Sequence, residues 1–128
     1  MYYNDLLLGT LRFINQYKYV IIRGTGIRAK RLMEEIESWQ SIAPALYYEV
    51  RRKLRCFVDN AVDKQGTTFF GVSVITPEGI LRNDSSASFQ GIGPTLYVLA
   101  VADYRSIIEE IEKENNSQIR VITDKAFC

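Results

Sequence analysis

The stretch Val20-Ile21-Ile22-Arg23-Gly24-Thr25-Gly26-Ile27-Arg28-Ala29-Lys30-Arg31 decides how this chain folds. It opens on three successive β-branched residues, which are typical of a short buried strand. Two glycines then interrupt the strand. Beyond them the apolar residues recur at helical spacing, and they are Leu32, Met33, Ile36 and Trp39. We therefore expect a strand over residues 19–22, a glycine turn, and an amphipathic helix over residues 27–39.

The glycine turn is the strongest candidate for a binding site. The first amides of a helix have no partner within the helix, and its dipole makes that end positive. Glycines let a ligand approach the backbone, and Arg23 and Arg28 flank the turn, where they can pair with phosphate oxygens. We predict that a phosphate group is bound by Arg23, Gly24, Thr25, Gly26 and Arg28. The alternative is a structural turn with arginines that lie in solvent.

Known phosphate motifs match this turn only in part. The third glycine of G-x-G-x-x-G is missing, and so is the G-K-[ST] of a Walker loop. A polar loop over residues 82–88 offers further hydrogen-bonding groups, and we expect its Arg82 and Asn83 to close over the bound ligand.

Elements of both types are expected outward from the glycine turn. Helices are predicted over residues 4–16, capped by Asn4 or Asp5, and from Asp103 onward. Strands are predicted over residues 67–76, 96–101 and 119–123. A turn at 77–79 is expected to join the first of these strands to a short strand at 80–81 in a hairpin. The expected fold is one α+β domain over residues 1–128, with a single mixed or antiparallel sheet and three to four helices.

Residues 45–62 fit two patterns. As a helix, the segment gathers Leu46, Val50, Leu54 and Phe57 on one arc, and Pro44 suits its first turn. As a strand, it alternates apolar and charged residues but places Phe57 on the polar face. The helix is favoured because it leaves fewer large apolar groups exposed.

Composition excludes several classes of protein. The 128 residues include no histidine, so Ser-His-Asp and Cys-His catalysis and His-bearing metal sites are excluded. Two cysteines make no disulfide framework, which indicates a reduced, cytoplasmic protein. No membrane segment, metal or cofactor is expected, and with no catalytic set in view we expect the protein not to be an enzyme.

Charge is unevenly distributed although the net charge is only +1. Residues 1–58 hold ten Lys/Arg against five Asp/Glu, and residues 59–128 hold six against ten. Such asymmetry can orient a partner protein, or lead the chain to pair head to tail as a homo-oligomer.

Gly24, Gly26 and Ile27 also give a resemblance to a known family. The strand–glycine–helix stretch resembles that of Alba-type nucleic-acid-binding domains, in which a glycine, a small residue and an isoleucine open the second helix. If residues 45–76 formed a long basic hairpin, the resemblance would cover residues 4–76. It implies an Alba-like fold and a nucleic acid as the partner.

These observations favour a protein that binds and holds a phosphate-bearing ligand, such as a nucleotide or a nucleotide-derived signal, so as to sense or sequester it. A first alternative is a protein–protein inhibitor, such as an immunity protein or a phage-encoded antagonist of a host enzyme. A second is a module for single-stranded nucleic acid, bound through the basic half of the chain.

Overall fold

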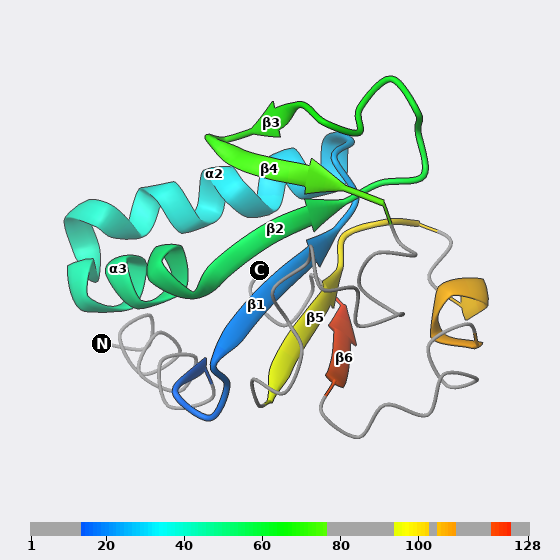
Figure 1. The fold of residues 1–128 in the computed structure, drawn as a ribbon. Coiled ribbons are helices and arrows are strands. Elements are labelled where there is room, and N and C mark those ends of the chain that lie inside the picture. The colour runs from blue at the N-terminus through cyan, green and yellow to red at the C-terminus, as the bar shows by residue number, and fades with distance from the viewer. Residues whose placement is uncertain (1–13, 77–93, 103–104, 110–118, 124–128) are drawn as a thin grey trace.

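A computed structural model describes residues 14–76, 94–102, 105–109 and 119–123. The labelled elements, in chain order, are β1 (Tyr19–Arg23), α2 (Ile27–Ile42), α3 (Pro44–Lys53), β2 (Leu54–Val58), β3 (Thr68–Phe69), β4 (Val72–Ile75), β5 (Thr95–Leu99) and β6 (Ile119–Thr123). A short helical stretch also covers residues 105–109. Figure 1 shows one twisted sheet with α2 and α3 lying together on one of its faces.

The six strands lie in the order β3-β4-β2-β1-β5-β6. All neighbouring pairs are parallel except β3 with β4. The chain builds outward from β1 through β2 to β4, and then returns to the other side of β1 with β5 and β6. The fold is therefore a single α/β domain with a mostly parallel sheet, and the expectation of an α+β fold was wrong. Two consecutive helices between β1 and β2 hid the β-α-β alternation in the sequence.

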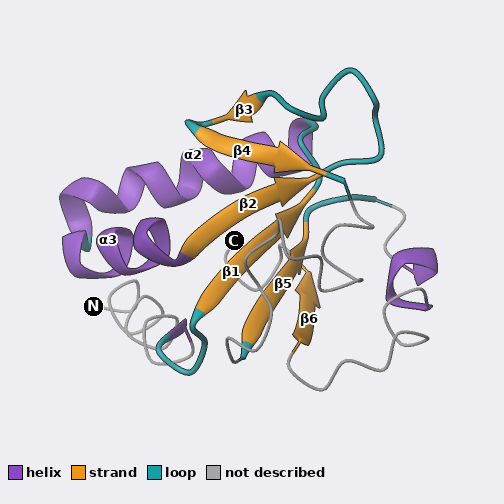
Figure 2. Ribbon diagram, in the orientation of Figure 1, coloured by secondary structure: helices purple, strands orange, loops and turns teal. Residues whose placement is uncertain are grey.

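Both faces of the sheet are buried, and side chains alternate between them along β1. Figure 2 shows α2 and α3 together on one side of the strands. Val20 and Ile22 join the larger core, which α2 and α3 cover. Ile21 joins a smaller core on the opposite face with Tyr97, Leu99 and Ile107, among others. Strands buried on both faces read as continuous apolar runs, as residues 20–22 do. The predicted strands at 19–22, 96–101 and 119–123 and the helix at 27–39 are confirmed to within a few residues.

The segment 45–62 is helix first and strand second. Helix α3 ends at Lys53, and β2 begins at the next residue. Val50 belongs to the helical pattern, whereas Cys56, Phe57 and Val58 are all buried within β2. Both single-element predictions were wrong, because neither allowed a strand that has no polar face. Since residues 44–53 are helical and β2 pairs parallel with β4, the long hairpin on which the Alba resemblance depended is absent.

The predicted strand over residues 67–76 is divided by a tight turn. Phe70 and Gly71 have φ values of +50° and +78°, as the central residues of a type I′ hairpin turn require. The turn sends β4 back along β3, with Phe69 opposite Val72. The other predicted hairpin, at residues 77–81, lies outside the described residues, and so does the helix at 4–16 apart from its last residues, beginning at Ile14.

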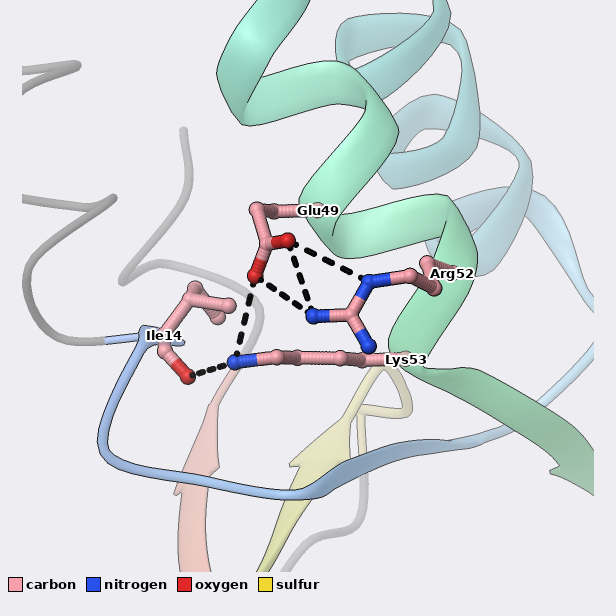
Figure 3. Close-up of polar contacts among 4 residues, drawn as sticks. All are labelled: Ile14, Glu49, Arg52 and Lys53. Atoms are coloured by element: carbon pink, nitrogen blue, oxygen red, sulfur yellow. Dashed lines mark hydrogen bonds and ion pairs between the residues drawn. The ribbon is translucent and has the colours of Figure 1, made fainter.

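A polar cluster fixes the last turn of α3 (Figure 3). The Lys53 ammonium donates to the backbone carbonyl of Ile14 at 3.0 Å and lies 3.4 Å from a Glu49 carboxylate oxygen. Arg52 donates to both oxygens of the same carboxylate. Hydrogen bonds from Arg52 are the main reason that the pKa of Glu49 lies below its ordinary value. Lys53 is buried but fully paired, so this cluster is structural.

No helix in the described parts of the chain is long and apolar enough to cross a membrane.

Candidate functional site

The order of the strands reverses at β1, and this places a crevice at the carboxyl ends of β1 and β5. In open α/β sheets, ligands bind where the winding direction changes, outside the carboxyl ends of the strands. Here the backbone is tied across that edge. The Gly24 amide donates to the Val58 carbonyl at 2.7 Å, and the Ala100 amide donates to the Arg23 carbonyl at 2.9 Å. The glycine turn predicted from sequence therefore opens at the crevice.

Gly24 has a geometry that only glycine satisfies. Its φ is +113°, and a Cβ atom there would lie 2.7 Å from the Ala100 carbonyl oxygen and 2.8 Å from Val101 Cγ1. The turn after β1 consequently passes very close to the end of β5. In dinucleotide-binding turns the first glycine likewise permits a tight turn directly after the strand.

Helix α2 begins directly after the turn. Gly26 is its N-cap, and its first turn contains no acidic residue, so the positive end of the helix dipole has no carboxylate within the helix itself. Ala29 is fully buried and lies at the third position of the G-x-G-x-x-G spacing. That position accepts alanine as well as glycine, because its role is close packing of helix against strand. The sequence thus reads G-x-G-x-x-A, with alanine in place of the third glycine.

Asp59 follows β2 and lies beside the glycine turn. Thr25 Oγ1 donates to Asp59 Oδ2 at 2.5 Å, and the Ala61 amide donates to Asp59 Oδ1 at 2.8 Å. Burial by itself raises the pKa of Asp59, but hydrogen bonds from Thr25 and Ala61, together with the charge of Lys64, outweigh it. The net pKa of Asp59 is lowered, so its carboxylate is ionised at neutral pH. Sequence reasoning missed this residue, although an acidic residue directly after the buried run Cys56-Phe57-Val58 is the signal for it.

A cavity of ≈ 250 Å³ lies at this edge of the sheet, with polar groups at the strand ends and apolar groups around them. It is lined by Arg23, Gly24, Val58, Asp59, Asn60, Val101, Ser106 and Ile107. The residues come from the ends of β1, β2 and β5 and from the helical stretch at 105–109. The cavity therefore spans the point where the strand order reverses.

Arg23 is the charged residue set deepest at this edge. It is 4% exposed, and one guanidinium nitrogen donates to the Tyr97 hydroxyl at 3.4 Å. Tyr97 and Ile21 lie on the face of the sheet opposite α2, so Arg23 points to that face as well. The guanidinium is thus held beneath the crevice.

The predicted site residues are distributed unequally around the cavity. Arg23 and Gly24 line it, whereas Thr25 reaches it through Asp59. Gly26 is exposed at the start of α2, and Arg28 is half-buried and not among the lining residues. Arg82 and Asn83 lie outside the described residues. That these seven residues bind a ligand stays a prediction.

No family model matches the chain, and no curated protein matches it. Among solved structures, the chain is similar to the UDP-D-quinovosamine 4-dehydrogenase from Vibrio fischeri, with a TM-score of 0.52 and 19% sequence identity. The match covers 84% of this chain and 77% of that chain. At this identity the likeness is one of fold. It gives no support to the alternative of a protein–protein inhibitor. The chain is a single Rossmann-like α/β domain, with its candidate site where such sheets reverse direction.

Proposed function

We propose that this protein binds a nucleotide across the crevice at the carboxyl ends of β1, β2 and β5. The phosphates lie at the Gly24–Gly26 turn and the first amides of α2, and the ribose hydroxyls donate to Asp59. One observation carries this proposal: the hydrogen bond from Thr25 to Asp59 joins the phosphate-binding turn to a carboxylate at the point where the strand order reverses.

The chemistry of Asp59 suits a sugar hydroxyl. Each of its oxygens accepts one hydrogen bond from the protein, and an ionised carboxylate oxygen can accept at least one more. Its negative charge repels phosphate, so the phosphates lie on the helix side of the turn. An acidic residue after the second strand contacts the ribose in dinucleotide-binding sheets of this winding.

The size of the cavity sets how much of the ligand is enclosed. Small-molecule sites occupy about 300–1,000 Å³. A cavity of ≈ 250 Å³ encloses a nucleoside-sized part of the ligand and leaves the remainder along the edge of the sheet.

We further propose that the nucleotide is held and not converted. The described residues that line the cavity include no lysine, tyrosine or cysteine, and the chain has no histidine that could activate Ser106 as a nucleophile. Incubation with a bound nucleotide, followed by chromatography, should recover it unchanged. A product that requires the protein would overturn this part of the proposal.

Isothermal titration with ADP, NAD, UDP and UDP-glucose tests the binding. At least one of these should bind, and Asp59→Asn should weaken it by about 10–100-fold, because a hydrogen bond to a charged group contributes ~1.5–3 kcal/mol. Asp63→Asn is the matched control, since Asp63 is exposed in the same loop and does not line the cavity. Absence of binding at millimolar concentration, or equal losses in the two variants, would overturn the proposal.

A further inference from the structure

The buried guanidinium of Arg23 needs a partner that the described residues do not supply. In the parts of the chain that the structure describes, its one hydrogen bond goes to the neutral Tyr97 hydroxyl, at the long distance of 3.4 Å. No described carboxylate lies within ion-pair distance of it. Asp59 lines the same cavity but forms no ion pair with Arg23, and its oxygens accept from Thr25 and Ala61 instead.

Lys53 shows how this protein treats another buried cation. It is about as buried as Arg23, yet it lies 3.4 Å from the Glu49 carboxylate and donates to the Ile14 carbonyl. Burying a charge is costly unless the charge is paired and hydrogen-bonded. Arg23 bears that cost while lining a cavity, and this is the arrangement of a site whose counter-charge arrives with a ligand.

The surroundings of Arg23 strengthen its attraction for an anion. Val58, Val101 and Ile107 form the apolar part of the cavity wall, and an apolar wall increases the energy of a charge pair. A planar guanidinium also pairs bidentately with carboxylate or phosphate oxygens.

This anion position differs from the one at the start of α2. Helix α2 packs on the face that holds Val20 and Ile22, whereas Arg23 lies with Ile21 on the opposite face. A phosphate at the first amides of α2 and an anion at Arg23 are therefore on different sides of the sheet edge. One ligand can reach both only if it carries two anionic groups.

We infer that the cavity binds a second anionic group of the nucleotide, a carboxylate or phosphate beyond the one held at α2, and that Arg23 selects for it. This inference rests on the proposed function and names the class of its ligand. The shared chemistry is an oxyanion that pairs with a buried guanidinium. Its source is either an acidic sugar or an additional phosphate.

Matched ligand pairs separate these sources. Titration of the wild type compares UDP-glucose with UDP-glucuronate, which differ by a carboxylate on the sugar, and NAD with NADP, which differ by a phosphate on the ribose. We expect the more anionic member of one pair to bind at least tenfold more tightly. We expect Arg23→Met to abolish that preference, and Arg52→Met, at an exposed arginine far from the cavity, to retain it.

A measurement without nucleotide keeps the inference testable if a variant binds poorly. In anion-free buffer, Arg23→Met should melt at the same temperature as the wild type or higher, because it removes an unpaired buried charge. Adding inorganic phosphate should raise the melting temperature of the wild type more than that of Arg23→Met. If Arg23→Met melts lower and neither protein responds to phosphate, the charge of Arg23 is matched within the chain, and the inference fails.

The two proposals fail in different ways. This inference would be overturned if the nucleotides bound the wild type without preference in either pair and bound Arg23→Met equally well. That result would leave the proposed function standing. A wild type that binds none of the nucleotides would overturn both.

Discussion

Replacing Gly24 by alanine should destabilise the protein more than any other single-methyl addition at this turn. The substitution adds one methyl group at a φ of +113°, with 2.7 Å to the Ala100 carbonyl oxygen and 2.8 Å to Val101 Cγ1. Both distances are much shorter than van der Waals contact. The nearer atom belongs to the backbone, so it cannot move away by a change of side-chain rotamer.

The magnitude follows from three contributions. Backbone strain at such a φ costs ~1–3 kcal/mol, and overpacking costs a further ~1–3 kcal/mol. Alanine has less conformational entropy than glycine in the unfolded chain, and this stabilises the folded state by ~0.4–1 kcal/mol. We expect Gly24→Ala to lower the free energy of unfolding by about 3 kcal/mol. With a urea m-value of about 1.5 kcal/mol/M, the unfolding midpoint falls by about 2 M.

Gly26→Ala is the matched control two residues away. Its φ is −89°, and a Cβ there meets nothing within 4 Å, so alanine adds no strain or clash, and we expect only the loss of a favoured N-cap residue, about 0.5–1 kcal/mol. Urea unfolding followed by Trp39 fluorescence measures both variants, because this single tryptophan is buried in the larger core. A loss below 1 kcal/mol for Gly24→Ala, or equal losses for the two variants, would refute the close approach of the turn to β5.

Three further predictions concern titration and burial. Because the pKa of Asp59 is lowered, its ionised form stabilises the fold above its ordinary pKa of 3.8, and this contribution is lost as the pH falls through the folded value; Asp59→Asn should show a flatter loss of stability in acid melts. Burial raises the pKa of Cys56 to about 12, so in a Cys128→Ser background the native protein should not react with a thiol reagent at pH 8, and rapid labelling would contradict this. Lys53→Met should cost about 1–3 kcal/mol in chemical unfolding, because it leaves the buried Ile14 carbonyl without its donor and removes one of the two cations beside Glu49, whereas the exposed Arg52→Met should cost less than about 1 kcal/mol; the reverse order would argue against Lys53 as the residue that fixes the end of α3.

The local elements were largely predictable, and the strand order was not. A run of β-branched residues, then a glycine turn, then apolar residues that recur every 3.6 positions, specifies β1 and α2 almost without tertiary information. The pairing of β1 with both β2 and β5 depends on contacts between distant residues, which periodicity does not report. The assignment to α+β failed at this step.

The boundary between α3 and β2 shows a second limit. Helix α3 passes into β2 with no intervening loop, so no glycine or proline marks the change at Lys53 and Leu54. A stretch of sequence that spans both elements, such as residues 45–62, combines the 3.6-residue repeat of a helix with the two-residue repeat of a strand. Only the burial of three successive residues in β2 shows where the strand lies, and burial is a property of the folded sheet.

The candidate site was predicted in part. The turn and Arg23 were identified from sequence, and the structure places Arg23 and Gly24 at a cavity. Asp59 was missed because its importance arises from a neighbour 34 residues away in the chain, Thr25. Spacing rules assume one helix between the two strands, and this chain has two.

The position of β1 at the centre of the sheet has a consequence for how the chain acquires its structure. Its partners on the two sides come from residues 54–58 and 95–99, so β1 must wait until residue 99 has been synthesised before both of its edges are paired. Loops of this length close slowly, because the entropy cost precedes the contacts that reward it. The unit β1-α2-α3-β2 can form early and expose the β5-facing edge of β1. During translation that edge is where a wrong strand, or a second nascent chain, would attach.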